Sequence, residues 1–176
     1  SKPSKVTQRK ISSLYDQARR LSQGNRLGKA ESIFRRILAL DDGHAESWYE
    51  LGALAVQTGR MDEAATMSAK AVALRPNFPG ALYNLGLALA ARGDTEGAIA
   101  SYERALAVRP DYADALVNLG SALSHIGRTE DALARYERAL ALKAKSPTNL
   151  LDYPLLQVEQ ENCQRPCCHH HSHRER

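Results

Sequence analysis

The chain has 176 residues, of which 43% are hydrophobic and 25% are charged, and this balance excludes an intrinsically disordered chain. Its formal net charge of +4 raises the question of nucleic-acid binding. The charges alternate in sign, however, and no basic stretch is interleaved with aromatic residues, so we expect no nucleic-acid partner.

Residues 1–10 form a polar, basic extension without an apolar run that would act as a signal peptide or a membrane span. We therefore expect a cytoplasmic protein with no membrane partner. Cysteine usage agrees with a reducing compartment, because all three cysteines lie near the end of the chain, at Cys163, Cys167 and Cys168. An odd number of cysteines in one short segment is not a disulfide framework.

Apolar residues spaced three and four apart, punctuated by glycine and proline, predict eight helices. We expect them over residues 5–23, 27–40, 45–57, 61–74, 79–91, 95–108, 113–125 and 129–142. Short turns make successive helices antiparallel. Asp62, Thr95 and Thr129 stand near the starts of every second helix after the first pair, where we expect them to satisfy free backbone N–H groups.

The sequence repeats itself, since a glycine in one register recurs every 34 residues at Gly52, Gly86 and Gly120. The clearest unit is 79–112, in which Arg109-Pro110 ends the second helix. A fixed period of this length predicts an array of stacked helical hairpins. We place the array at 11–145, with repeats at about 11–44, 45–78, 79–112 and 113–146.

The pattern Trp48-x-x-Leu51-Gly52, followed by Ala64, Ala71 and Pro76, resembles the tetratricopeptide repeat family. The resemblance covers all four repeats. It implies an all-α fold, a right-handed superhelical solenoid of about four antiparallel helix-turn-helix repeats, with an irregular C-terminal tail over 146–176. It also implies a protein-protein interaction scaffold that binds an extended peptide or a partner surface in its concave groove.

The first helix of each pair is expected to line that groove, with a row of tyrosines beside a row that changes from carboxylate to amide. The candidate peptide-binding residues are Tyr15, Asp16, Arg19, Tyr49, Glu50, Tyr83, Asn84, Leu87, Val117, Asn118, Ser121 and His125. Asn84 and Asn118 could both donate to and accept from a peptide backbone, and tyrosine adds rigid contact area. The alternative is that the tyrosines pack between adjacent first helices and the asparagines are merely solvated.

Charge placement predicts what the groove prefers. Acidic residues lie on its wall at Asp16, Glu46, Glu50 and Asp114, whereas the second helices carry basic residues on the outer side at Arg35, Arg36, Lys70, Arg104, Arg135 and Arg138. We therefore expect the groove to prefer neutral or basic segments.

The second half of the array carries a narrower resemblance. Tyr83-Asn84-Leu85-Gly86 and Val117-Asn118-Leu119-Gly120 are similar to the asparagine-lined repeats of O-linked N-acetylglucosamine transferases, which hold substrate peptides for a catalytic domain. Asp16 and Glu50 depart from that pattern in the first half. The resemblance implies an alternative function, in which the chain is the truncated N-terminal substrate-recognition module of a larger enzyme such as a glycosyltransferase.

No catalytic constellation accompanies the repeats. His44 lies at a predicted turn and His125 near a helix end, and neither has a paired nucleophile in the sequence. The glycines are spaced by the repeat and do not form a phosphate-binding loop. We therefore expect neither enzyme activity nor a cofactor.

The tail departs from the repeat pattern, because Pro147, Pro154 and Pro166 interrupt any long helix. We expect its leucines to cover the last repeat in part, or else that Leu133 and Leu140 stay exposed and support self-association. Metal binding there would be adventitious, because the spacing of the ligands fits no closed structural site. These ligands are Cys163, Cys167, Cys168, His169, His170, His171 and His173.

Overall fold

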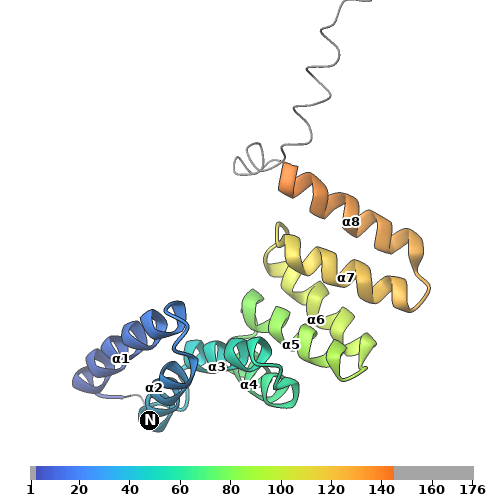
Figure 1. Cartoon of the computed structure of the whole chain (residues 1–176). Helices are drawn as coiled ribbons and strands as arrows, with labels where there is room; N and C mark the ends of the chain where they lie inside the picture. Colours follow the sequence, from blue (N-terminus) through green and yellow to red (C-terminus); the bar gives the residue numbers. More distant parts are fainter. Residues whose placement is uncertain (1–2, 145–176) are drawn as a thin grey trace, which may run out of the picture.

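A computed structural model describes residues 3–144, which form eight α-helices and no strand (Figure 1). The helices are α1 (Lys5–Gln23), α2 (Leu27–Leu40), α3 (Ala45–Gln57), α4 (Met61–Leu74), α5 (Pro79–Ala91), α6 (Thr95–Val108), α7 (Ala113–His125) and α8 (Thr129–Ala144). The predicted helices are confirmed at both ends, except that α8 continues two residues further than expected. The predictions for the tail, including the partial cap, concern residues outside the described part of the chain.

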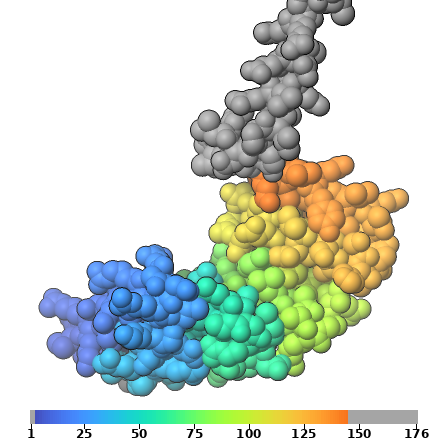
Figure 2. All heavy atoms as spheres, viewed as in Figure 1, coloured from blue at the N-terminus to red at the C-terminus, as the bar shows by residue number. Residues whose placement is uncertain are grey.

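The helices pack as four consecutive pairs, α1 with α2 through α7 with α8, and each second helix also packs on the first helix of the next pair. The pairs follow one another along a curved path (Figure 1). The space-filling view shows the same arc, with the first and the fourth pair at its two ends (Figure 2). Each pair therefore buries its apolar faces against its neighbours, as a stacked array requires.

The core of each pair is built around one position of the second helix, which is occupied in turn by Phe34, Ser68, Tyr102 and Tyr136. The ring of Tyr102 is 1% exposed and lies against Gly86, where an added Cβ would be only 2.4 Å from Tyr102 Cε1. The register glycines therefore give the facing ring the space that a side chain would fill. In the second pair the small residue Ser68 takes the place of the ring, and a Cβ at Gly52 would lie 2.6 Å from Ser68 Oγ.

The turns within the last three pairs share a conformation. Glycine has a positive φ in each of them, 75° at Gly59, 83° at Gly93 and 80° at Gly127. Other residues rarely adopt this backbone conformation, so the glycine allows the chain to reverse there. The turn of the first pair instead uses Asn25, with φ 56°, because asparagine tolerates the left-handed region better than most residues.

Thr95 and Asp62, two of the predicted capping residues, lie one and two positions after the N-cap positions of α6 and α4. Asp94, and not Thr95, caps α6, since its Oδ1 accepts a hydrogen bond from Gly97 N at 2.9 Å. Helix α4 begins after Arg60, which makes no side-chain cap, and Asp62 lies within its first turn. Sequence reasoning missed this because the acceptor must precede the first helical residue, and that boundary is uncertain by a residue or two.

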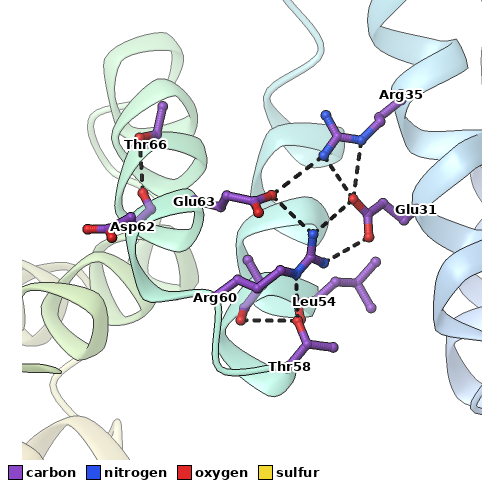
Figure 3. A network of polar contacts seen from close by, with 9 residues as sticks. Glu31, Arg35, Leu54, Thr58, Arg60, Asp62, Glu63 and Thr66 are labelled. Atoms are coloured by element: carbon purple, nitrogen blue, oxygen red, sulfur yellow. Dashed lines mark hydrogen bonds and ion pairs between the residues drawn. The ribbon is translucent and has the colours of Figure 1, made fainter.

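A network of ion pairs joins α2 of the first pair to the start of α4 in the second pair (Figure 3). Arg60 donates to both carboxylate oxygens of Glu31, at 2.8 and 3.2 Å, and to Glu63 at 3.0 Å. Arg35 donates to Glu31 at 2.8 Å. Hydrogen bonds from Arg60 and Arg35 hold the pKa of the Glu31 carboxyl below its usual value of 4.5.

This network predicts a pH dependence of stability. The ionised form of Glu31 is favoured in the folded protein, so its contribution is present above pH 4.5 and is lost as the pH falls through the lowered pKa. Glu31→Gln should reduce the free energy of unfolding by about 1 kcal/mol at pH 7. Urea unfolding should show this difference shrinking at pH 3, whereas Glu103→Gln, an exposed control, should change little at either pH.

The two ends of the array differ. Interior residues Val72 and Ile99 are each 9% exposed because the next pair covers them. In α8, Leu133 lies one period after Ile99 and is 55% exposed. Leu140 lies two periods after Val72 and is 67% exposed. Among the described residues, α8 thus leaves an apolar face uncovered.

Candidate groove on the first helices

The first helices of neighbouring pairs lie side by side, since α3 contacts α5 and α5 contacts α7. Their side chains meet across the pairs. Tyr15 donates its hydroxyl proton to Glu50 Oε1 at 3.0 Å, and Asn118 Nδ2 donates to the hydroxyl of Tyr83 at 2.9 Å. Each bond joins a tyrosine of one first helix to the predicted carboxylate or amide row of the next.

The equivalent pair in the middle of the array is not hydrogen-bonded. The ring of Tyr49 lies against Gly80, where an added Cβ would be 2.8 Å from Tyr49 Cε2. Asn84 is 7% exposed, and its Nδ2 has no hydrogen-bond partner. Leaving such a group unpaired costs about 1–3 kcal/mol, so this amide gains free energy from any acceptor that reaches it.

Burial raises the pKa values of the tyrosine hydroxyls in this row, at Tyr15, Tyr49 and Tyr83. The carboxylate of Glu50 raises the pKa of Tyr15 further. All three hydroxyls therefore stay protonated at neutral pH. Because Tyr83 accepts from Asn118, its own proton is available to a second acceptor.

Arginines neutralise part of the predicted acidic wall. Arg19 Nε lies 3.6 Å from Glu50 Oε1, and Arg75 is hydrogen-bonded to Glu46. Asp16 is exposed and makes no ion pair with a described residue. The wall is therefore less acidic than the sequence suggests, because sequence spacing alone did not show which arginines reach these carboxylates.

Sequence reasoning also missed an aromatic residue just before each following first helix. His44 packs on Tyr15 with ring centroids 5.4 Å apart, Phe78 on Tyr49 at 4.7 Å, and Tyr112 on Tyr83 at 4.9 Å. The signal was present, because residues 44, 78 and 112 are one period apart. The tyrosine row is thus half-buried beneath a second row of rings.

In two of these places an arginine lies over the added ring. The guanidinium carbon of Arg75 is 4.7 Å from the centroid of Phe78, and that of Arg109 is 3.3 Å from the centroid of Tyr112. Burial raises the pKa of Tyr112 to about 12, although the charge of Arg109 opposes the shift. Stacking of this kind is favourable because the face of an aromatic ring attracts a cation.

The remaining predicted groove residues make no hydrogen bond between the described first helices of neighbouring pairs. Leu87 is half-buried and packs with Tyr83 against a core cluster. Val117 occupies the tyrosine position of the last pair and is half-buried. Ser121 and His125 are exposed on α7 and contribute no hydrogen bond to the rows.

Within residues 3–144, no group of three or more histidine, cysteine or acidic side chains could hold a metal ion. The predicted adventitious ligands, Cys163 through His173, lie outside the described part of the chain. None of the eight helices is long and apolar enough to cross a membrane.

A curved stack of helical hairpins whose first helices share a wall defines the class as a helical-repeat scaffold. Two family models, each described as tetratricopeptide repeat, match residues 15–81 and 77–145. The chain belongs to the tetratricopeptide repeat family. The predicted family and fold class are therefore confirmed.

Solved structures agree with this assignment. A crystal structure of MamA is 24% identical over 77% of this chain and 79% of that one, with a TM-score of 0.70. MamA from Desulfovibrio magneticus RS-1 is 21% identical over 78% and 77%, with a TM-score of 0.69. An O-GlcNAc transferase mutant from Thermobaculum terrenum is 32% identical over 68% of this chain but only 23% of that one, with a TM-score of 0.64. No curated protein matches the chain.

Proposed function

We propose that the chain is a non-enzymatic scaffold that binds an extended peptide of a partner protein along the wall formed by its first helices. Support comes from its membership of the tetratricopeptide repeat family and from the hydrogen bonds that align successive first helices. The wall offers donors for peptide carbonyl groups and ring surface for side chains. Binding of this kind selects an extended backbone more than a particular sequence.

The unpaired amide of Asn84 is the observation that carries this proposal. Its Nδ2 is a buried donor without an acceptor, halfway along the wall and one residue from the available hydroxyl proton of Tyr83. A peptide carbonyl that approached beside Tyr49 would satisfy it. The bond would recover the penalty of about 1–3 kcal/mol that an unpaired buried donor carries, and this gain would add to the binding free energy of an extended peptide.

Selection from a random peptide library on the wild-type protein tests the proposal. Titrated by fluorescence anisotropy, selected peptides should bind the Asn84→Ala/Asn118→Ala variant about tenfold more weakly or worse, because two hydrogen bonds are lost. Asn77→Ala, an exposed turn residue, is the matched control and should bind as wild type does. Equal affinity for wild type and the double variant would remove the wall from the binding site.

A second candidate is that the chain presents substrates for a larger enzyme such as a glycosyltransferase. The 32% identity to the Thermobaculum terrenum O-GlcNAc transferase structure favours it, although this chain spans only 23% of that one. The two candidates share the same peptide-binding wall. They differ in whether a catalytic domain is encoded directly downstream.

The exposed face of α8 favours self-association as an additional property. Leu133 and Leu140 offer apolar surface that another copy of the chain, or part of residues 145–176, would bury. Sedimentation of the samples prepared for the titration reports the oligomeric state directly. A cytoplasmic location and the absence of nucleic-acid and membrane partners stay predictions.

A further inference from the structure

The start of the array contains a cavity of about 620 Å³ that is open to solvent between α1 and the N-terminal end of α3. Its wall includes Ile11, Ser12, Tyr15, Asp41, His44 and Glu46. Ile11 is 4% exposed and supplies an apolar floor. The cavity therefore combines apolar, aromatic and acidic surfaces within one opening.

The lining residues correspond, one period earlier, to the surroundings of Arg75. In the second repeat, Arg75 stacks on Phe78 and bonds to Glu46, with Tyr49 packed on the same ring. The residues one period before these four are Asp41, His44, Ser12 and Tyr15, and all of them line the cavity. The cavity thus lies where the following repeat places the side chain of its own arginine.

The charge at this place is reversed. The next two repeats have arginines at the equivalent position, each stacked on a ring, whereas the first repeat has Asp41. Asp41 Oδ1 accepts a hydrogen bond from Gly43 N at 3.1 Å, and the carboxylate makes no ion pair with any described residue. The ring centroids of Tyr15 and His44 lie 5.4 Å apart, and within residues 3–144 no guanidinium stacks on either ring as Arg75 and Arg109 do on theirs.

We propose that this cavity binds an arginine side chain of the partner segment, with its guanidinium against the rings of Tyr15 and His44 and paired with Asp41. The proposal rests on the proposed function, because it adds a side-chain pocket at one end of the peptide-binding wall. Ile11 contacts the methylene groups of the arginine. A planar guanidinium suits the site better than an ammonium group, since it can stack on a ring and pair with a carboxylate at once.

NMR spectra of the ¹⁵N-labelled full chain test the pocket with a defined probe, a short capped alanine peptide with a single central arginine. Saturable shifts are expected at the amides of residues 41–46 and in α1 near Tyr15. The same peptide with citrulline, which keeps the shape but lacks the charge, should give no saturable shifts. Equal binding of the citrulline peptide would overturn the proposal.

Two variants test the assignment of the carboxylate. Asp41→Asn keeps an oxygen to accept from Gly43 N, so the turn is retained, and it should weaken binding of the arginine peptide about fivefold or more. Asp111→Asn removes the same charge at a later turn and should leave binding unchanged. If both variants weakened binding of the arginine peptide equally, the peptide would be responding to the net charge of the protein and not to Asp41, and this result would contradict a specific site.

A gain of affinity provides a test that loss of folding cannot imitate. Ser12 lies one period before Glu46, whose carboxylate pairs with Arg75 in the second repeat. Ser12→Glu should therefore place a second carboxylate beside Asp41 in the cavity and tighten binding of the arginine peptide about fivefold. The Asn84→Ala/Asn118→Ala variant should bind the arginine peptide as wild type does. If library peptides bound the double variant as tightly as wild type while the arginine peptide still shifted residues 41–46, the wall alone would be overturned. If library peptides bound the double variant more weakly but the arginine peptide gave no saturable shifts at 41–46, the arginine pocket alone would be overturned.

Discussion

Gly86→Ala is expected to destabilise the array by about 3 kcal/mol or more, because the added methyl group overpacks the interior of the third repeat. Its Cβ would lie 2.4, 2.7 and 2.9 Å from three ring atoms of Tyr102. The ring is 1% exposed and has no space into which it can turn. Helices α5 and α6 would have to move apart to make room for the methyl group. This movement would also disturb their contacts with α4 and α7.

Two other glycines calibrate this experiment, which is read by urea unfolding. A Cβ at Gly28 meets nothing within 4 Å, so Gly28→Ala should be neutral or stabilise α2 by up to about 1 kcal/mol. Gly120→Ala should cost less than Gly86→Ala, since Tyr136 is only half-buried and can move. A similar loss at Gly28 and Gly86 would show that the close packing of Tyr102 is not the cause.

Phe34→Ala should lower the free energy of unfolding by about 3–5 kcal/mol, the usual cost of removing a fully buried aromatic ring. Phe34 is 0% exposed, and its ring centroid lies 5.7 Å from that of Tyr15. Its removal therefore leaves a cavity beneath the first tyrosine of the wall. Because an array is held together mainly by contacts between neighbours, we expect α1 and α2 to lose protection before the other helices.

Hydrogen exchange resolved by helix measures this loss, and Tyr136→Ala provides the matched comparison. Tyr136 occupies the same repeat position as Phe34 but is half-buried at the other end of the array. Truncating it should cost clearly less. If Phe34→Ala and Tyr136→Ala lowered the free energy of unfolding equally, the burial of the ring would not explain its contribution to stability.

The sequence predicted the helices well because their signals are local and repeated. Each helix boundary is marked by a glycine or proline turn, and the 34-residue register recurs through Gly52, Gly86 and Gly120. A helix boundary that is ambiguous in one repeat can be placed from the equivalent residues of the next repeat. The displaced cap at Asp94 shows the limit of this reasoning, since one residue decides which side chain reaches the free N–H groups.

The contacts between neighbouring first helices were predicted only in part, and peptide binding along them stays a prediction. The sequence identified the rows of tyrosines and amides, and the bonds Tyr15–Glu50 and Tyr83–Asn118 show that these rows meet. Which side chains pair across them depends on distances between helices, which no periodicity gives. The unpaired, buried amide of Asn84 and the arginine that pairs with Glu46 are consequences of such distances.

The unequal ends of the array set a direction for its growth. In α1, the exposed Ser13 and Arg20 stand where α5 has the buried Ala81 and Ala88, so this surface of α1 is polar. The leucines of α8 keep the shape of an interior seam. A hairpin packed on α8 would bury these leucines, whereas a hairpin packed on α1 at the equivalent place would cover Ser13 and Arg20 in place of apolar side chains.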